Sequence, residues 1–283
     1  MSESAPAGGQ LLRQWRERRH LSQLELALTA GISTRHLSFV ETGRSQPSRE
    51  MIVNRAERLE VPLRERNVLL VACGYAPVFK ESSLDDPVLR AARRAVDLVL
   101  AGLEPCPALA FDRHWTLVAA NQATLRLFEG VDAALLQPPV NVLRVALHPG
   151  GLAPRIVNLG EWRSYILARL RRQIEVSGDA VLAGLLEEFS AYPPTGSVLR
   201  ARAAEVNGPY AGVVVRFQLA TDGAVLSFFS ASTIFGTPID VTLSELAIES
   251  FFPADEETLL ILRRLAESNA ENPGGAVRHA AVS

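Results

Sequence analysis

The spacing of apolar residues predicts two short helices within residues 21–44. Gly31 separates them, because a glycine readily takes the positive φ that ends a helix. Ser22 followed three positions later by Glu25 forms a capping box at the start of the first helix, and Ser33 is suited to cap the second. Two short helices joined by a tight glycine turn are expected to form a helix-turn-helix.

The apolar residues of this pair also predict which side of each helix faces the core. In the first helix they recur three and four positions apart, as the buried stripe of an amphipathic helix does. The expected inward residues are Leu24, Ala27 and Leu28 in the first helix, and Leu37 and Val40 with Ile32 in the second. The opposite side of the second helix faces outward and is available to bind a partner.

The outer side of the second helix carries side chains suited to a DNA major groove. An arginine makes a bidentate contact to guanine, a threonine contacts any base, and a phenylalanine packs on a thymine methyl group. Arg35 is therefore the main candidate for sequence specificity, whereas Arg44 and Gln23 are expected to contact phosphate, which adds affinity without sequence information. The candidate DNA-binding residues are Gln23, Ser33, Thr34, Arg35, Ser38, Phe39 and Arg44.

A short helix pair alone also fits a helical hairpin in a larger fold, with Arg35 and Arg44 as solvated charges. The longer pattern of LSQLELA, AGIS and RHLSFVETGRSQPSRE, however, resembles the XRE type, the lambda-repressor-like helix-turn-helix regulators. The resemblance implies binding to a double-stranded DNA operator, usually by a homodimer. The chain departs from the common pattern at Phe39, a position that is often polar, so the resemblance does not predict which base this residue prefers.

Further helices are predicted on both sides of this pair. Apolar residues from Leu11 to Trp15 mark a preceding helix, Ser48 caps a fourth, and Pro62 opens a fifth that ends near Cys73. Most of the remaining arginines are expected to be solvated partners of neighbouring glutamates. The predicted organisation is a disordered tail at 1–9, a DNA-binding domain at 10–80 and a linker helix at 81–105. The apolar stripe expected on the linker helix is Val88, Ala92, Ala95, Val96, Val99 and Leu103, which packs on its own chain or joins a second subunit.

After Pro107 the apolar period changes to two, which indicates strands. Two short strands with a turn at Arg113 and His114 come first, and residues 141–192 are mostly helical. Further strands are expected at 199–206, 210–220, 224–235 and 243–252, with a closing helix at 255–268. The predicted fold class is α+β: an all-α N-terminal helix-turn-helix bundle followed by a PAS-like antiparallel sheet with helices at 106–270, and then a disordered tail at 271–283.

Four segments of this second half, AFDRHWTLVAAN, LHPGGLAPRIVNLGEW, FFSASTIFGTPIDVT and ELAIESFFPAD, resemble the ligand-binding part of MmyB-like transcription regulators. The resemblance implies a PAS-like pocket for a small hydrophobic ligand, with a fatty acid as the leading suggestion. The aromatic residues and the arginine of the long middle helix have two interpretations. In the first, the aromatic rings form an apolar pocket wall and the arginine binds an acid head group; in the second, the rings belong to the core and the arginine is a surface charge. The candidate ligand-binding residues are Phe111, Trp115, Trp162, Tyr165, Arg169, Phe228 and Phe235.

Charge and composition narrow the possible functions. The chain has a net charge of −2, which divides into +4 for residues 1–80 and −6 for the rest, so the positive field lies at the predicted DNA-binding end. Two cysteines are too few for a disulfide framework, and His114, His148 and His279 lack metal-ligand spacing. We therefore expect a cytoplasmic protein that is not an enzyme, with no catalytic residues, no metal, no obligatory cofactor and no membrane partner. The alternative function is a DNA-bound scaffold whose PAS-like domain dimerises or recruits a partner protein without a ligand.

Overall fold

The computed structural model describes residues 8–29, 31–83, 86–193, 215–221, 223–234, 240–270 and 278–279. The predicted strand at 199–206 and the candidate ligand residue Phe235 lie outside these ranges. The chain divides into two compact units. One contains Met1–Ser83 and two short later segments, and the other contains the remaining residues; each unit is described by itself.

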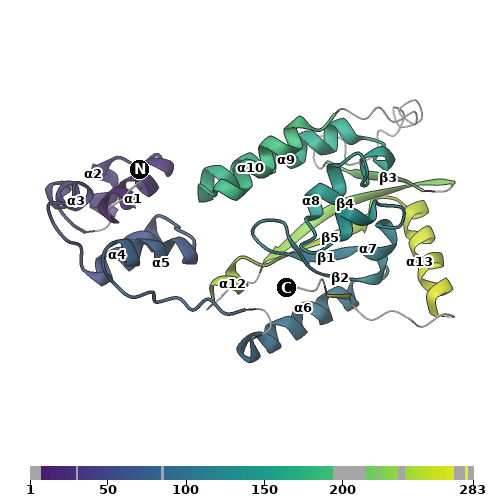
Figure 1. The fold of residues 1–283 in the computed structure, drawn as a ribbon, viewed down its shortest axis with the longest axis horizontal. Helices are drawn as coiled ribbons and strands as arrows, with labels where there is room; N and C mark the ends of the chain where they lie inside the picture. Colours follow the sequence, from purple (N-terminus) through teal and green to yellow (C-terminus); the bar gives the residue numbers. More distant parts are fainter. Residues whose placement is uncertain are drawn as a thin grey trace. The chain divides into compact units, whose positions relative to one another are not determined.

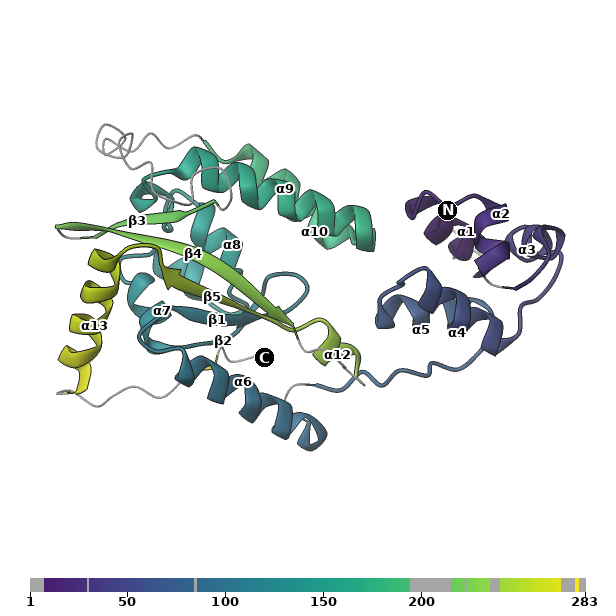
Figure 2. The same cartoon turned by 180° about the vertical axis from the view of Figure 1, so that it is seen from behind.

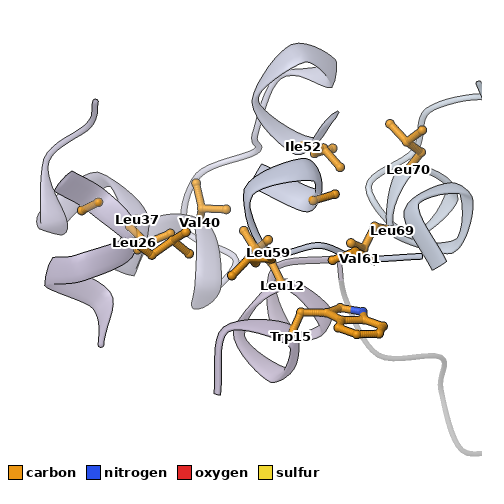
Figure 3. Close-up of a cluster of buried hydrophobic side chains, with 12 residues drawn as sticks. Leu12, Trp15, Leu26, Leu37, Val40, Ile52, Leu59, Val61, Leu69 and Leu70 are labelled. Atoms are coloured by element: carbon orange, nitrogen blue, oxygen red, sulfur yellow. The ribbon is translucent and has the colours of Figure 1, made fainter. Parts of the chain in front are cut away.

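The N-terminal unit contains the five expected helices. They are α1 (Gly8–Arg18), α2 (Gln23–Thr29), α3 (Thr34–Glu41), α4 (Arg49–Arg58) and α5 (Leu63–Ala72). Their apolar sides enclose one core, to which each of the five helices contributes aliphatic side chains and α1 adds Trp15 (Figure 3). The labelled core residues are Leu12, Trp15, Leu26, Leu37, Val40, Ile52, Leu59, Val61, Leu69 and Leu70.

The predicted caps and turn are confirmed. The Glu25 backbone N–H donates to Ser22 Oγ at 3.2 Å, and the Ser22 N–H donates to Glu25 Oε2 at 2.7 Å, which completes the capping box. Ser33 accepts a hydrogen bond from the backbone of His36, and Gly31 has a φ of +65°. Each of these features is local, so the sequence alone is sufficient to predict it.

The predicted inner stripe of α2 is largely wrong. Leu24 is 57% exposed and Leu28 is 71% exposed, whereas Leu26 and Ala27 are buried. The seven-residue helix has apolar residues around most of its circumference, so two different stripes satisfy helical spacing. Packing of α2 against α3 selects the side that carries Leu26 and Ala27.

The predicted disordered tail at 1–9 is too long by two residues, because α1 begins at Gly8. Gly8 and Gly9 are buried, and a Cβ at Gly9 would lie 2.0 Å from the Val40 carbonyl oxygen. A Cβ at Gly8 would lie 2.1 Å from Cys73 Sγ. These two glycines therefore let the start of α1 approach α3 and α5 closely.

The second unit is built on an antiparallel sheet with the strand order β3-β4-β5-β1-β2-β6. The strands are β1 (Ala108–Phe111), β2 (Leu117–Ala120), β3 (Phe217–Thr221), β4 (Ala224–Ile234), β5 (Ala247–Pro253) and β6 (Arg278–His279). The α+β prediction is thus confirmed: a helical helix-turn-helix region is followed by a sheet with helices. Two residues of the predicted tail at 271–283 pair with β2 as β6.

One predicted strand begins later than expected. Val241–Ser244 form a short helix, α12, and β5 starts only at Ala247. Asp240 Oδ1 accepts a hydrogen bond at 2.9 Å from the backbone N–H of Thr242 at the start of this helix. A side chain that bonds to nearby backbone in this way favours a helix start over a strand.

Helices cover both faces of the sheet. In both views α9 (Leu159–Ser177) and α10 (Ala180–Ala191) lie on one side, and α6 (Arg90–Gly102) lies on the other (Figure 1 and Figure 2). Alternation along β1 divides these faces: Ala108 and Ala110 pack in the cluster under α6, and Leu109 and Phe111 point to the opposite side. The remaining elements are η1 (Pro87–Leu89), α7 (Gln122–Leu127), η2 (Ala133–Leu136), α8 (Val142–Leu147), η3 (Ala153–Arg155) and α13 (Glu256–Ala270).

The predicted linker helix is part of this second unit. Val96 and Leu100 of α6 are buried in a cluster with sheet residues, and Leu103 packs against it. Val99, expected on the inner stripe, is 41% exposed. The small alanines of β1 allow α6 to lie close to the sheet, and this contact determines which side of α6 is buried.

Candidate functional site

The outer side of α3 presents the residues expected to read bases. Leu37 and Val40 are buried beneath it, Arg35 is exposed, and Thr34 and Ser38 are half-buried. The Arg35 guanidinium carbon lies 5.4 Å from the centre of the Phe39 ring, which is within cation–π distance. Arg35 and the unusual Phe39 therefore form one contiguous part of the surface that is expected to read bases.

Arg44 lies in the turn that follows α3. Gly43 takes a φ of +74°, and the backbone N–H of Arg44 donates to the Phe39 carbonyl at 2.8 Å. The Arg44 side chain is exposed, directly after the recognition helix. An exposed guanidinium on a turn that backbone hydrogen bonds hold is compatible with the expected phosphate contact.

Gln23 makes a different contact from the expected one. Its Nε2 donates to Glu41 Oε2 at 2.8 Å, and the same carboxylate accepts two hydrogen bonds from Arg16, at 2.7 and 3.0 Å. A phosphate contact by Gln23 would have to compete with this bond. The Gln23 side chain thus connects α2 to an ion pair that joins α1 and α3.

This ion pair belongs to a buried charge cluster that sequence analysis missed. The hydrogen bond to Glu41 raises the pKa of Arg16, whereas burial lowers the pKa of Arg55, against the attraction of Glu41. Arg55 is 2% exposed, and its Nε and Nη1 have no hydrogen-bond partner among the described residues. These side chains were expected to be solvated, and no spacing along the sequence shows that α1, α3 and α4 bring them together.

The second unit contains a partly open, apolar cavity of about 70 Å³ between the sheet and its covering helices. Four predicted ligand residues line it: Phe111, Trp115, Trp162 and Arg169. Tyr165 instead contacts the Trp162 ring at 5.5 Å, and the buried Phe228 packs behind the wall against Phe217 and Phe251. The lining residues that were missed are Pro107, Leu109, Thr124, Leu127, Phe128, Val142, Leu143, Ala146, Leu152, Ile166, Phe217, Glu249 and Phe251.

Aromatic rings form much of the cavity wall. Phe111 and Trp115 stack at 4.4 Å with an angle of 6° between their planes, and Trp162 lies 4.9 Å from Phe217. Alternation along a strand offered a signal for Leu109 and Phe251, since each lies two residues from another residue on the cavity side. Nothing along the sequence indicated that helix α8 adds Val142 and Leu143.

A polar group closes one part of the wall. Arg169 Nη1 donates to both Glu249 oxygens at 3.1 Å, and Ser232 Oγ donates to Glu249 Oε2 at 2.6 Å. The Arg169 guanidinium carbon also lies 4.6 Å from the centre of the Trp115 ring. Arg169 therefore lies at the cavity as expected, but it is already paired with a carboxylate of the protein.

The Asp112 and His114 side chains both have partners within the protein. Asp112 Oδ1 accepts hydrogen bonds at 2.8 Å from the backbone N–H groups of His114 and Thr116, and it thereby closes the turn between β1 and β2. His114 Nε2 lies 2.9 Å from Asp179 Oδ2. The described residues contain no group of three or more potential metal ligands, and none of the described helices is long and apolar enough to cross a membrane.

Comparison with known proteins agrees with these two sites. Residues 12–66 match the helix-turn-helix family model, and residues 92–265 match that of the MmyB-like transcription regulator ligand binding domain. No curated protein matches the chain. A solved structure described as an RNA-binding Light-Oxygen-Voltage receptor is 15% identical over 93% of this chain, with a TM-score of 0.26. This chain spans 63% of that protein's chain. Because the ligand-binding model covers more than half of the chain, the protein belongs to the family with an MmyB-like transcription regulator ligand binding domain.

Proposed function

We propose that this DNA-binding transcription regulator responds to a small, largely apolar molecule held in the cavity of its second unit. The observation that carries the proposal is the apolar, aromatic-lined cavity inside the domain that matches a ligand-binding family. Pockets for small molecules are mostly apolar, with a few polar groups that fix orientation, and this cavity has that composition. The order of two strands, helices and then three antiparallel strands supports a PAS-like domain.

A fatty acid is the first ligand to test, because the resemblance of the sequence suggests it. The cavity volume of about 70 Å³ is below the ~300–1,000 Å³ of most ligand pockets. An acyl chain of more than a few carbons therefore requires lining side chains to move. The small volume is also the observation that favours the second candidate function, a DNA-bound scaffold whose second domain dimerises or recruits a partner.

Mass spectrometry of solvent extracts from the natively purified protein distinguishes these two functions. The regulator predicts a stoichiometric small apolar molecule, and the extract is compared with that of an unrelated protein purified in the same way. The protein freed of this molecule is then titrated with DNA selected from a random pool, with and without the molecule. If the extract contains no stoichiometric molecule and no apolar ligand changes the DNA affinity, the scaffold function is the better account.

A further inference from the structure

The charges at the cavity wall restrict which head group a ligand can carry. Among the lining residues that the structure describes, Arg169 and Glu249 are the charged ones, and they neutralise each other. The Glu249 carboxylate is 7% exposed and accepts hydrogen bonds from both Arg169 and Ser232. An ionised fatty acid at Arg169 would place a second carboxylate beside Glu249 in a poorly solvated space, where like charges are unfavourable.

A second observation concerns Trp162, which lines the same cavity and is 4% exposed. Its indole Nε1 is buried and has no hydrogen-bond partner among the described residues. The rings of Tyr165 and Phe217 lie 5.5 and 4.9 Å from the Trp162 ring, and these are contacts of ring to ring. A buried donor without an acceptor destabilises a protein, so a ligand that brings an acceptor to this N–H would gain a hydrogen bond and remove that cost.

We propose that the cavity takes an uncharged, largely apolar molecule with a carbonyl oxygen, such as an ester, amide or lactone, and not an ionised fatty acid. The carbonyl oxygen accepts a hydrogen bond from Trp162 Nε1, and the apolar part lies against Phe111, Trp115 and Phe251. The Arg169–Glu249 pair stays intact on binding. This inference rests on the proposed ligand-binding function and names the class of ligand for it.

The test compares three ligands of one chain length on the whole 283-residue chain, after removal of any bound molecule: octanoate, methyl octanoate and octane. Their dissociation constants are measured at neutral pH by displacement of a fluorescent probe. Methyl octanoate is expected to bind about tenfold more tightly than octanoate, because it brings no charge to Glu249. Tighter binding of octanoate than of its methyl ester to the unmodified protein would overturn the proposal, and this comparison needs no variant.

Two variants test the two observations separately. Glu249→Gln should improve octanoate binding about tenfold and leave methyl octanoate nearly unchanged, because it removes the competing carboxylate. Glu188→Gln is the matched control, since Glu188 forms a comparable pair with Arg144 at 2.7 Å and does not line the cavity. Unimproved octanoate binding in a folded Glu249→Gln protein would contradict the role of Glu249.

Trp162→Phe removes the indole N–H and keeps an aromatic ring. It should weaken methyl octanoate binding by roughly threefold to tenfold, the effect of one neutral hydrogen bond, and leave octane unchanged. Equal losses for both ligands would show that Trp162 acts only by packing and would overturn its assignment as donor. If none of the three ligands binds the unmodified protein, the proposed ligand-binding function fails as well. If octanoate binds more tightly than its methyl ester, only the proposed class of ligand fails.

Discussion

At the residue scale, the two arginines of the recognition region differ in their surroundings. Arg35 lies on the exposed side of α3 against the Phe39 ring, whereas Arg44 extends from the turn that follows the helix. A side chain held on the helix surface can be directed at one base edge, whereas an exposed charge on a turn suits a phosphate. Substitutions at the two positions should therefore fail in different ways.

Arg35→Ala is expected to weaken binding to the preferred DNA by about 1–3 kcal/mol and to relax the preference at one base pair. Arg44→Ala should weaken all sequences alike and lower the salt dependence of log K by about one unit. Titrations of matched and single-mismatch DNA at several salt concentrations measure both effects. Arg13→Ala is a control, because Arg13 is exposed on α1 and paired with Glu17. An unaltered base preference in Arg35→Ala would show that Arg35 does not contact a base.

The buried carboxylate of Glu41 makes a second prediction at this scale. Glu41→Gln removes the charge that faces both Arg16 and Arg55, so Arg16 keeps only the more exposed Glu17, at 3.6 Å, and Arg55 loses the attraction of Glu41. Loss of one partner from a buried ion pair costs about 3–5 kcal/mol of the free energy of unfolding. Urea unfolding monitored by Trp15 fluorescence measures the change, provided that Trp115 and Trp162 are first replaced by phenylalanine.

Glu17→Gln provides the comparison, because its pair with Arg13 is solvent-exposed and exposed pairs contribute little. We expect no measurable change in stability for this variant. If Glu41→Gln proved as stable as Glu17→Gln, the ion pair with Arg16 would not be what joins α1 to α3.

At the element scale, the start of α1 depends on close approach to α3. Gly9 lies against the Val40 carbonyl, and backbone on both sides leaves little room to adjust. Gly9→Ala should therefore destabilise the N-terminal unit by about 1–3 kcal/mol, as overpacking of a close contact does. The midpoint temperature of thermal unfolding and the DNA affinity should both decrease, because α1 packs on α3.

Gly102→Ala at the end of α6 is the matched control. A Cβ there meets nothing within 4 Å, so alanine should be neutral or raise the free energy of unfolding by up to about 1 kcal/mol. A Gly9→Ala protein as stable as Gly102→Ala would show that α1 can shift away from α3 without cost.

At the scale of the whole molecule, regulation requires coupling between a site in each unit. If the ligand favours one conformation of the protein, DNA and ligand must change each other's affinity by the same factor, typically about 5- to 150-fold. We expect methyl octanoate, as a representative ligand, to shift the DNA dissociation constant, and operator DNA to shift the ligand constant equally. Two titrations, each at saturating amounts of the other partner, measure the two factors. Unequal factors would show that the titrations do not report one linked equilibrium. If neither affinity changes, so that both factors equal one, the cavity does not regulate DNA binding.

The expected homodimer is a further prediction at this scale. One helix-turn-helix unit contacts only a few base pairs, so two copies on an inverted repeat should protect half-sites about 34 Å apart, one turn of DNA. Footprinting on selected DNA, with the stoichiometry measured by analytical ultracentrifugation, tests this arrangement. A single short footprint from a 1:1 complex would contradict it.

The sequence by itself determined the features that depend on neighbouring residues. Ser22, Glu25 and Ser33 mark helix starts and Gly31 marks the turn, because capping and positive φ act over three or four positions. The change of apolar period after Pro107 likewise predicted the strands β1 and β2. Together with the resemblance of its motifs, these local signals were sufficient for the fold class and for the two functional regions.

Only the tertiary structure decided which of several equivalent residues are buried and which charges meet. The choice of Leu26 over Leu24 in α2 depends on the surface of α3, which no local pattern contains. Arg169 and Glu249 are 80 positions apart, so their pairing at the cavity follows from the way α9 crosses β5. Periodicity shows that a face is apolar, but long-range packing determines what it lies against, and here it gives the cavity a neutral charge that the sequence did not reveal.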